Sequence, residues 1–125
     1  MLPHVTQEEI IMNTTKGSLG IENALTSKLE KELDILKRHI QILKIIKREE
    51  PIGIIRLSEI TGFPHHKVRY SLRILEDEGI IEPSVEGAII LQKTDDYLQH
   101  FLTIITKMLT ELAVIKEELT TNGKD

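Results

Sequence analysis

The chain has 125 residues, which is enough for one domain or for a small core with appended helices. Only 3% of the residues are aromatic and none is tryptophan, so a protein that stacks single-stranded bases on aromatic rings is a poor expectation. Cysteine is absent, which excludes disulfides, thiolate catalysis and zinc sites built from thiolates.

Charge is distributed unevenly along the chain, whose formal net charge is -4. Residues 37–73 hold nine basic and three acidic side chains. Residues 1–36 hold three basic and six acidic ones, and residues 74–125 hold four and eleven. A basic middle between acidic ends predicts one positive surface on a molecule that is acidic elsewhere.

The N-terminal 20 residues show no sustained hydrophobic periodicity, and Gly17 and Gly20 are typical of a linker. We expect an N-terminal extension here that could be flexible. It lacks the basic flank and apolar run of a secretory signal, and no stretch of 18 uninterrupted apolar residues occurs in the chain. The sequence therefore predicts a soluble cytoplasmic protein that does not enter a membrane.

A long helix is predicted from about residue 22 to residue 50. Its apolar positions alternate at spacings of four and three, the seam of an amphipathic helix: Leu29, Leu33, Leu36, Ile40 and Leu43. Pro51 and Gly53 end it, and the β-branched run over 52–55 predicts a single short strand.

A short helix over 57–61, stopped by Gly62, and a second helix from Pro64 to about residue 78 follow. The apolar residues over 80–84 and 88–91 flank a turn at Glu86 and Gly87, which predicts a β-hairpin.

A final helix is predicted from Thr94, with two acidic residues in its first turn, to the Asn122-Gly123 pair. Its apolar stripe alternates at spacings of three and four: Leu98, Phe101, Ile105, Met108, Leu112, Ile115 and Leu119. A soluble monomer rarely exposes such a stripe, so we expect these seven residues to form a homodimer seam. The alternative is that the final helix folds back on the first helix of its own chain.

The short helix, turn and second helix carry a family resemblance. They read Leu57-Ser58-Glu59-Ile60-Thr61-Gly62-Phe63-Pro64 and Lys67-Val68-Arg69-Tyr70-Ser71-Leu72-Arg73-Ile74-Leu75-Glu76-Asp77-Glu78-Gly79-Ile80-Ile81. Together with the hairpin, they resemble the winged helix-turn-helix transcriptional regulators of bacteria and archaea, most of all short archaeal regulators with long flanking helices. The resemblance covers roughly half of the chain.

The resemblance implies a mainly α (α+β) fold, a winged helix-turn-helix domain with a small β-hairpin wing and long N- and C-terminal dimerisation helices. The expected parts are the N-terminal extension (1–20), a winged helix DNA-binding domain that includes the long first helix (21–93) and a C-terminal dimerisation helix (94–125). The implied function is sequence-specific binding of double-stranded DNA, as a homodimer, in transcription regulation.

The DNA-binding residues follow from the helix geometry. If Val68, Leu72 and Leu75 face inward, the opposite face of the second helix presents four side chains at spacings of three and four. The candidate set adds the exposed first turn and one residue of the short helix: His65, His66, Lys67, Arg69, Tyr70, Arg73 and Arg56. Arg69 or Arg73 could contact guanine in bidentate fashion, whereas Lys67, Tyr70 and Arg56 suit phosphate or sugar.

The hairpin departs from the family pattern at its tip. Wings of such regulators often carry lysine or arginine there, but this tip is Ser84-Val85-Glu86-Gly87 with Glu82 beside it. Carboxylates near phosphates oppose binding, so we expect the wing to add little affinity for DNA.

Two other classes of function were weighed. A winged helix module that binds only protein fits the same elements, with its basic face meeting an acidic partner. An enzyme is not expected, and neither is a cofactor. A metal site is not expected either, because neighbouring histidines such as His65 and His66 point about 100° apart on a helix and are poorly placed to bind one ion. A small-molecule effector stays open: Tyr97 and Phe101 could border a pocket, or they could simply be core.

Overall fold

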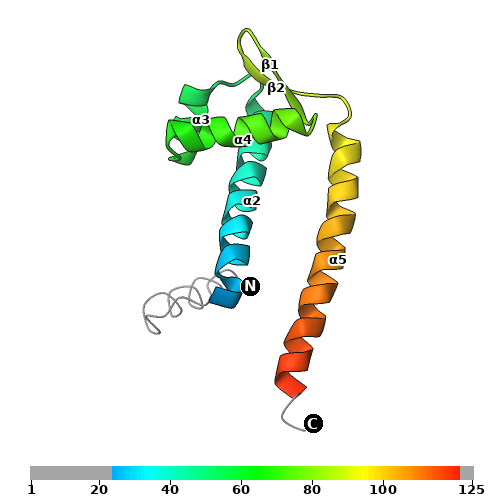
Figure 1. Cartoon of the computed structure of the whole chain (residues 1–125). Coiled ribbons are helices and arrows are strands. Elements are labelled where there is room, and N and C mark those ends of the chain that lie inside the picture. The colour runs from blue at the N-terminus through cyan, green and yellow to red at the C-terminus, as the bar shows by residue number, and fades with distance from the viewer. Residues whose placement is uncertain (1–23, 122–125) are drawn as a thin grey trace, which may run out of the picture. The chain divides into compact units, whose positions relative to one another are not determined.

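The structure is a computed structural model that describes residues 24–121, so the expected N-terminal extension lies outside the described residues. The elements follow one another as α2 (Ala24–Glu49), α3 (Ile54–Thr61), α4 (His65–Asp77), β1 (Ile81–Ser84), β2 (Gly87–Ile90) and α5 (Thr94–Thr121) (Figure 1). The described chain is therefore mostly helical with one small antiparallel hairpin, which confirms the α+β expectation.

The chain divides into two units, residues 1–38 and residues 39–125. The described part of the first unit is the N-terminal part of α2, where Leu29 and Leu33 are exposed and Thr26 Oγ1 donates a hydrogen bond to Glu30 Oε2 at 2.9 Å. All the other elements belong to the second unit.

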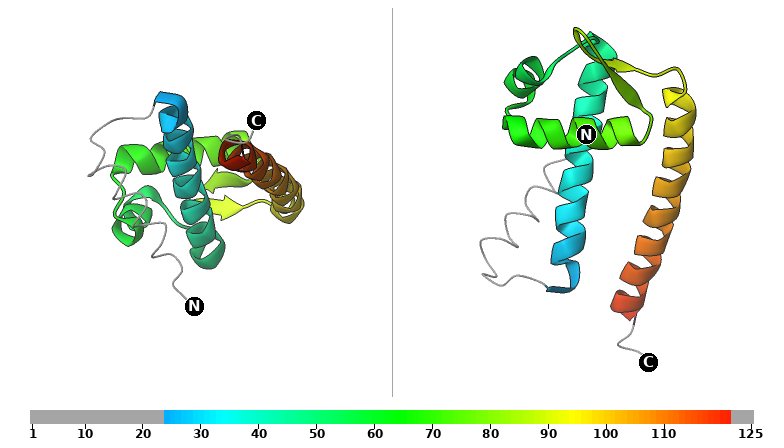
Figure 2. Two further views of the ribbon diagram at one scale, coloured as in Figure 1. Left: turned by 90° about the horizontal axis from the view of Figure 1, so that it is seen from below. Right: turned by 45° about the horizontal axis from the view of Figure 1, so that its top comes forward.

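The core of the second unit forms where α4 crosses the C-terminal half of α2 (Figure 1, Figure 2). Its buried apolar residues come from every element up to β2: Ile42, Leu43, Ile45, Ile46, Ile52, Leu57, Val68, Leu75, Ile80, Ile81 and Ala88. Burial of each large aliphatic side chain stabilises the fold by about 1.5–3 kcal/mol. Inward placement of Val68 and Leu75 agrees with the sequence expectation, and Leu72 is partly buried.

Helix α3 begins earlier than the sequence predicts, so the expected strand over 52–55 is wrong. Gly53 is the extended N-cap, and its carbonyl accepts a hydrogen bond from Leu57 N–H at 3.0 Å, which closes the first helical turn. Only Ile52 remains extended, and it pairs with Ala88 of β2 through two backbone hydrogen bonds of 3.2 and 2.8 Å. The preference of β-branched residues for strands depends on packing context, and here Ile54 packs partly against the core from the start of α3.

The turn between α3 and α4 depends on Gly62, as expected. This residue adopts a left-handed conformation with φ of 81°, and its N–H donates to the Ser58 carbonyl at 2.8 Å. Ser58 Oγ then donates to the Phe63 carbonyl, and Phe63 N–H donates to Thr61 Oγ1 at 3.1 Å. Pro64 caps α4 in extended conformation, which fixes where α4 starts relative to α3.

The first turn of α5 makes polar contacts with other elements of the second unit. Thr94 is buried, and its Oγ1 donates to the Ile80 carbonyl at 2.6 Å. Asp95 pairs with Lys47 of α2 at 3.5 Å, while Tyr97 OH donates to Glu78 Oε1 at 3.1 Å. The start of α5 is thus held by the end of α4 and by the C-terminal half of α2.

Beyond its first turns, α5 exposes its apolar side chains. By length and composition alone it would suffice to cross a membrane: an 18-residue window has a mean hydropathy of 1.3, and none of that window is buried. The expectation that the chain does not enter a membrane is therefore not settled by the length and hydropathy of α5.

Candidate nucleic-acid interface

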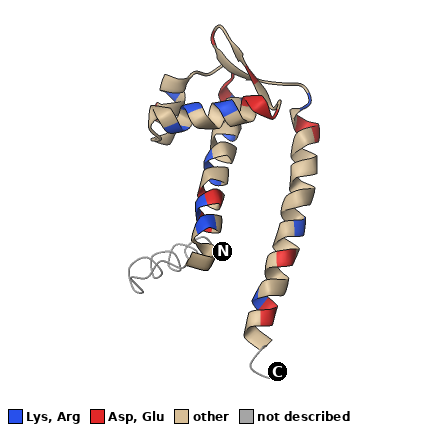
Figure 3. Cartoon of the chain, viewed as in Figure 1, with Lys and Arg blue, Asp and Glu red and all other residues tan. Residues whose placement is uncertain are grey.

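The exposed face of α4 gathers the residues that the sequence predicts for DNA. Val68, Ser71 and Leu75 are buried and define the inward side of the helix. The side chains predicted to contact DNA from α4 are all exposed: His65, His66, Lys67, Arg69, Tyr70 and Arg73. Lysine and arginine lie along the N-terminal part of α4, and acidic residues lie at its C-terminal end (Figure 3).

Arg73 is held against its neighbour on the same helix. Its guanidinium lies over the Tyr70 ring, with 5.6 Å between the guanidinium carbon and the ring centroid. A guanidinium on an aromatic face is attracted by the ring quadrupole and still presents its N–H edge outward. The stacking therefore leaves Arg73 able to donate hydrogen bonds from a restricted position.

The Tyr70 ring is in turn held by α2. It lies 5.8 Å from the His39 ring, centroid to centroid, at an interplanar angle of 40°. His39 Nδ1 shares a hydrogen bond of 2.8 Å with Ser71 Oγ, and Ser71 is fully buried. Side chains from two helices therefore connect a buried hydroxyl to the exposed arginine.

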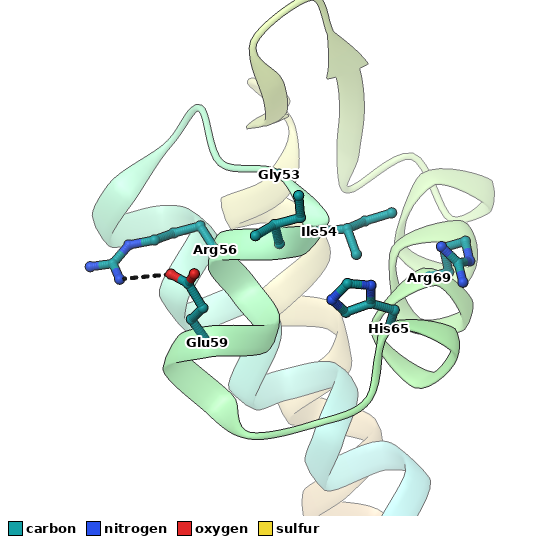
Figure 4. Close-up of a pocket in the computed structure, with 7 residues that line it drawn as sticks. Gly53, Ile54, Arg56, Glu59, His65 and Arg69 are labelled. Carbon is teal, nitrogen blue, oxygen red and sulfur yellow. Dashed lines mark ion pairs between the residues drawn. The ribbon is translucent and has the colours of Figure 1, made fainter.

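A hollow of about 660 Å³ lies between α3 and the N-terminal half of α4 (Figure 4). Arg56 and Glu59 border it from α3, and His65 and Arg69 border it from α4. Among the described residues, no carboxylate lies within ion-pair distance of Arg69. Arg69 can therefore donate to an acceptor that enters between the two helices.

Arg56, the predicted phosphate contact of the short helix, is engaged by two carboxylates. Its guanidinium lies 3.6 Å from Glu59 Oε1 and 4.0 Å from Glu49 Oε1. Because α3 begins early, Arg56 is its third residue and faces Glu59 one turn away. A phosphate would have to compete with these partners, so Arg56 is less available than its place in the sequence indicates.

The wing is acidic in the structure as in the sequence. Strands β1 and β2 pair antiparallel from Ile81 opposite Ile90 to Ser84 opposite Gly87. Val85 at the tip is fully exposed, and Glu82 and Glu86 are exposed as well. Since no lysine or arginine occurs over residues 81–90, the hairpin presents no cation to a phosphate.

Tyr97 and Phe101, where an effector pocket was left open, contact each other. Their rings stack with centroids 6.4 Å apart, and Tyr97 packs partly against the core. Burial and the hydrogen bond to the Glu78 carboxylate raise the pKa of the Tyr97 phenol above its ordinary value. These contacts favour a packing role for the two rings over a pocket wall.

The predicted seam on α5 changes character along the helix. Leu98 packs against the core, and Phe101 and Ile105 are partly buried. The remaining members are exposed: Met108, Leu112, Ile115 and Leu119. Leu102 and Leu109 add exposed apolar surface beside them, so the stripe continues uncovered through the C-terminal half of α5.

Sequence reasoning missed His39, Ser71, Glu49 and Glu59 as members or modulators of this surface. Ser71 could have been noticed, because a polar residue at an inward helix position predicts a buried hydrogen-bond partner. The identity of that partner, 32 positions away in the sequence, has no local signal.

Comparisons with known proteins do not show a family for this chain. No protein-family profile matches the chain, and no curated protein matches it. Among solved structures, the chain is similar to the activation domain of the phage T4 transcription factor MotA, with a TM-score of 0.44 and 18% sequence identity. The likeness covers 82% of this chain and 96% of that one. At this level of likeness the function has to be argued from the side chains.

Proposed function

We propose that the chain is a winged helix protein that binds duplex DNA sequence-specifically as a homodimer, and that it regulates transcription in the cytoplasm rather than acting as an enzyme. The observation that carries this proposal is the exposed face of α4. Arg69 and Arg73 stand one turn apart on it, and among the described residues neither is paired with a carboxylate.

A helix that exposes this face suits the DNA major groove, which admits one α-helix and displays a distinct pattern of donors and acceptors for each base pair. Arginine binds guanine O6 and N7 through two parallel hydrogen bonds. The stacking of Arg73 on Tyr70 supports such a role, because a restricted side chain loses less conformational entropy on binding.

Contacts with the DNA backbone are assigned to the first turn of α4. His65, His66 and Lys67 are exposed there, beside backbone N–H groups at a helix N-terminus that favours anions. Arg56 contributes less than these residues because Glu59 and Glu49 already neutralise it.

The acidic wing contributes little affinity in this account. Glu82 and Glu86 would face phosphate oxygens if the hairpin lay against the duplex, and like charges brought together oppose binding. We propose that the duplex contacts α3 and the exposed face of α4 from His65 to Arg73, and that the wing lies at its margin.

The homodimer is assigned to the exposed stripe of α5. A helix that crossed a membrane would be apolar on all sides, whereas α5 carries Lys107 and Glu111 in its middle and three threonines on the side away from the seam. Two recognition helices related by a twofold axis would meet major grooves roughly 34–36 Å apart, so the site should be an inverted repeat.

Binding titrations test the DNA part of the proposal. At about 150 mM salt, the chain should bind a mixed-sequence duplex more tightly than the corresponding single strand, and the Arg69→Ala/Arg73→Ala variant should lose most of this binding. Lys107→Ala/Lys116→Ala removes the same number of cations from α5 and should bind duplex as the native chain does.

Two results would contradict the proposal. Equal losses of duplex affinity in both variants would mean that binding depends only on the overall charge of the chain. No retention of duplex by the native chain would instead favour a winged helix module that binds protein alone.

A further inference from the structure

A second hollow lies at the other end of α4, between that helix and the hairpin. It has a volume of about 360 Å³, is open to solvent, and is called the wing hollow below. Ile52, Gly53 and Ile54 border it from the start of α3, Leu72 and Glu76 border it from α4, and residues 83–88 border it from the hairpin. No part of the proposed DNA contact requires this place.

The wing hollow combines an apolar floor with carboxylates at its margin. Ile52 and Ala88 are buried, and Ile54 and Leu72 pack partly against the core, so the apolar floor is part of the packed unit. Val85 stands fully exposed at one margin. An exposed valine beside an apolar hollow is apolar surface that the fold itself does not use.

The two carboxylates that line the wing hollow, Glu76 and Glu86, have no ion-pair or side-chain hydrogen-bond partner among the described residues. Other carboxylates of the unit are paired, among them Glu59 with Arg56 and Asp95 with Lys47. Apolar surface flanked by unpaired carboxylates complements a ligand that is aliphatic and cationic.

We propose that the wing hollow docks a segment of a partner protein that presents an aliphatic side chain flanked by lysine or arginine. The aliphatic side chain lies on Ile54, Leu72 and Ala88, next to Val85, and the flanking cations reach Glu76 and Glu86. Lysine and arginine suit this position because their stems cover apolar surface while their charged ends stay in water.

The shape of the wing hollow favours a peptide over the other occupants. Small-molecule sites bury most of the surface of their ligand, and the wing hollow is too open to do so. Nucleic acid is disfavoured because its phosphates would meet two carboxylates. A peptide segment, unlike a small molecule, continues beyond the wing hollow on both sides and can gain further contacts there.

This inference goes beyond DNA binding and does not depend on it. A regulator whose basic surface contacts a duplex would keep the wing hollow accessible to a protein at the acidic end of the same helix. Arg69 and Arg73 do not line the wing hollow, so a variant of both should bind the partner segment unchanged.

The test uses the full chain, labelled with ¹⁵N, and a short synthetic peptide of alternating lysine and leucine with blocked ends. At millimolar peptide, the amide signals of Ile54, Leu72 and Ala88 should shift, and a peptide with glutamate in place of lysine should shift none of them. Glu76→Gln/Glu86→Gln should weaken the affinity about fivefold, the loss expected for two exposed ion pairs. Val85→Ser should weaken it as well without affecting the fold, since Val85 touches solvent on all sides.

The matched control is Glu111→Gln/Glu117→Gln, which changes the net charge equally on α5, away from the wing hollow. This control and Arg69→Ala/Arg73→Ala should bind the lysine-leucine peptide as the native chain does. No shift at these three amides, equal binding of the two peptides, or equal loss in the control would overturn the proposal. None of these outcomes bears on duplex binding, which is measured separately.

Discussion

At the crossing of α2 and α4, three side chains form a chain of contacts that ends at Arg73. The buried Ser71 hydroxyl is hydrogen-bonded to His39, the His39 ring lies against Tyr70, and the Tyr70 ring lies beneath the Arg73 guanidinium. His39 is not one of the residues that we assign to DNA, but its ring lies against Tyr70, which is, and it limits where Tyr70 can lie. It is a positioning residue for Arg73.

Replacement of His39 tests that role. His39→Phe removes the hydrogen bond to Ser71 and should lower the free energy of unfolding by about 1 kcal/mol, measured by urea denaturation. Because Tyr70 is then less constrained, preference for the selected duplex over a scrambled one should fall as well. An unchanged duplex preference in His39→Phe would contradict the positioning role.

The raised pKa of Tyr97 makes the stability of the folded chain depend on pH. Burial and the Glu78 carboxylate favour the protonated phenol in the folded chain, so this contribution to stability is complete at neutral pH. It declines above pH 10 or so, where the tyrosine of the unfolded chain ionises first. The chain has two tyrosines, so Tyr70→Phe isolates the Tyr97 signal.

In the Tyr70→Phe background, absorbance titration should show that Glu78→Gln lowers the pKa of Tyr97, because the negative charge that opposes ionisation is removed. Asp77→Asn makes the same charge change next to Glu78 and should have a smaller effect, since Asp77 makes no hydrogen bond to Tyr97. If Glu78→Gln leaves the titration curve of Tyr97 unchanged, the hydrogen bond between Tyr97 and Glu78 is not formed in solution.

Among the elements, the hairpin depends most on a single residue. Gly87 has a φ of 131°, and a Cβ added there would lie 2.5 Å from the carbonyl carbon of Ile52. The close approach exists because Ile52 pairs with Ala88 and lines β2 on its outer side. Only a residue without a side chain lets the two backbones meet at this distance.

Gly87→Ala should therefore destabilise the chain by more than Gly62→Ala. Gly62 also has a positive φ, but a Cβ there would meet nothing within 4 Å, so its substitution reports backbone strain of about 1 kcal/mol alone. Thermal unfolding of the two variants gives the comparison. Equal losses would show that the Ile52 backbone moves away at no cost.

The elements themselves were largely predictable from the sequence, because helical and alternating periodicities, Gly62 and the two acidic residues after Thr94 are local signals. The start of α3 was not, since the β-branched run over 52–55 has the same appearance whether one residue or four are extended. The engagement of Arg56 followed from this shift, because it placed Glu59 one turn beyond the arginine. Contacts between distant positions, such as His39 with Ser71, leave no trace in a single sequence.

On the scale of the whole molecule, the exposed stripe of α5 has to be covered. Met108, Leu112 and Ile115 are each about half exposed, and a solvent-exposed stripe of this length is uncommon on a soluble monomer. The side of α5 away from this stripe carries several polar side chains. Thr103, Thr106 and Thr110 donate their hydroxyls to carbonyls within the helix, and Lys107 and Glu111 stand one turn apart.

Ile105→Asp/Leu112→Asp should convert the homodimer that we propose to a monomer, as measured by sedimentation equilibrium. Duplex affinity should fall on the order of a hundredfold, because two linked recognition helices no longer bind together. Thr103→Asp/Thr110→Asp adds the same charges to the opposite side of α5 and should remain a dimer. A native chain that is monomeric and sediments with lipid vesicles would contradict the dimer and assign the stripe to a bilayer.

The central claim is that α4 selects a duplex by its sequence, and recovery of bound duplexes from a random pool at about 150 mM salt tests it most directly. We expect the native chain to enrich an inverted repeat and Arg69→Ala/Arg73→Ala to enrich none. A recovered pool without any common sequence, or the same repeat enriched by both proteins, would contradict it.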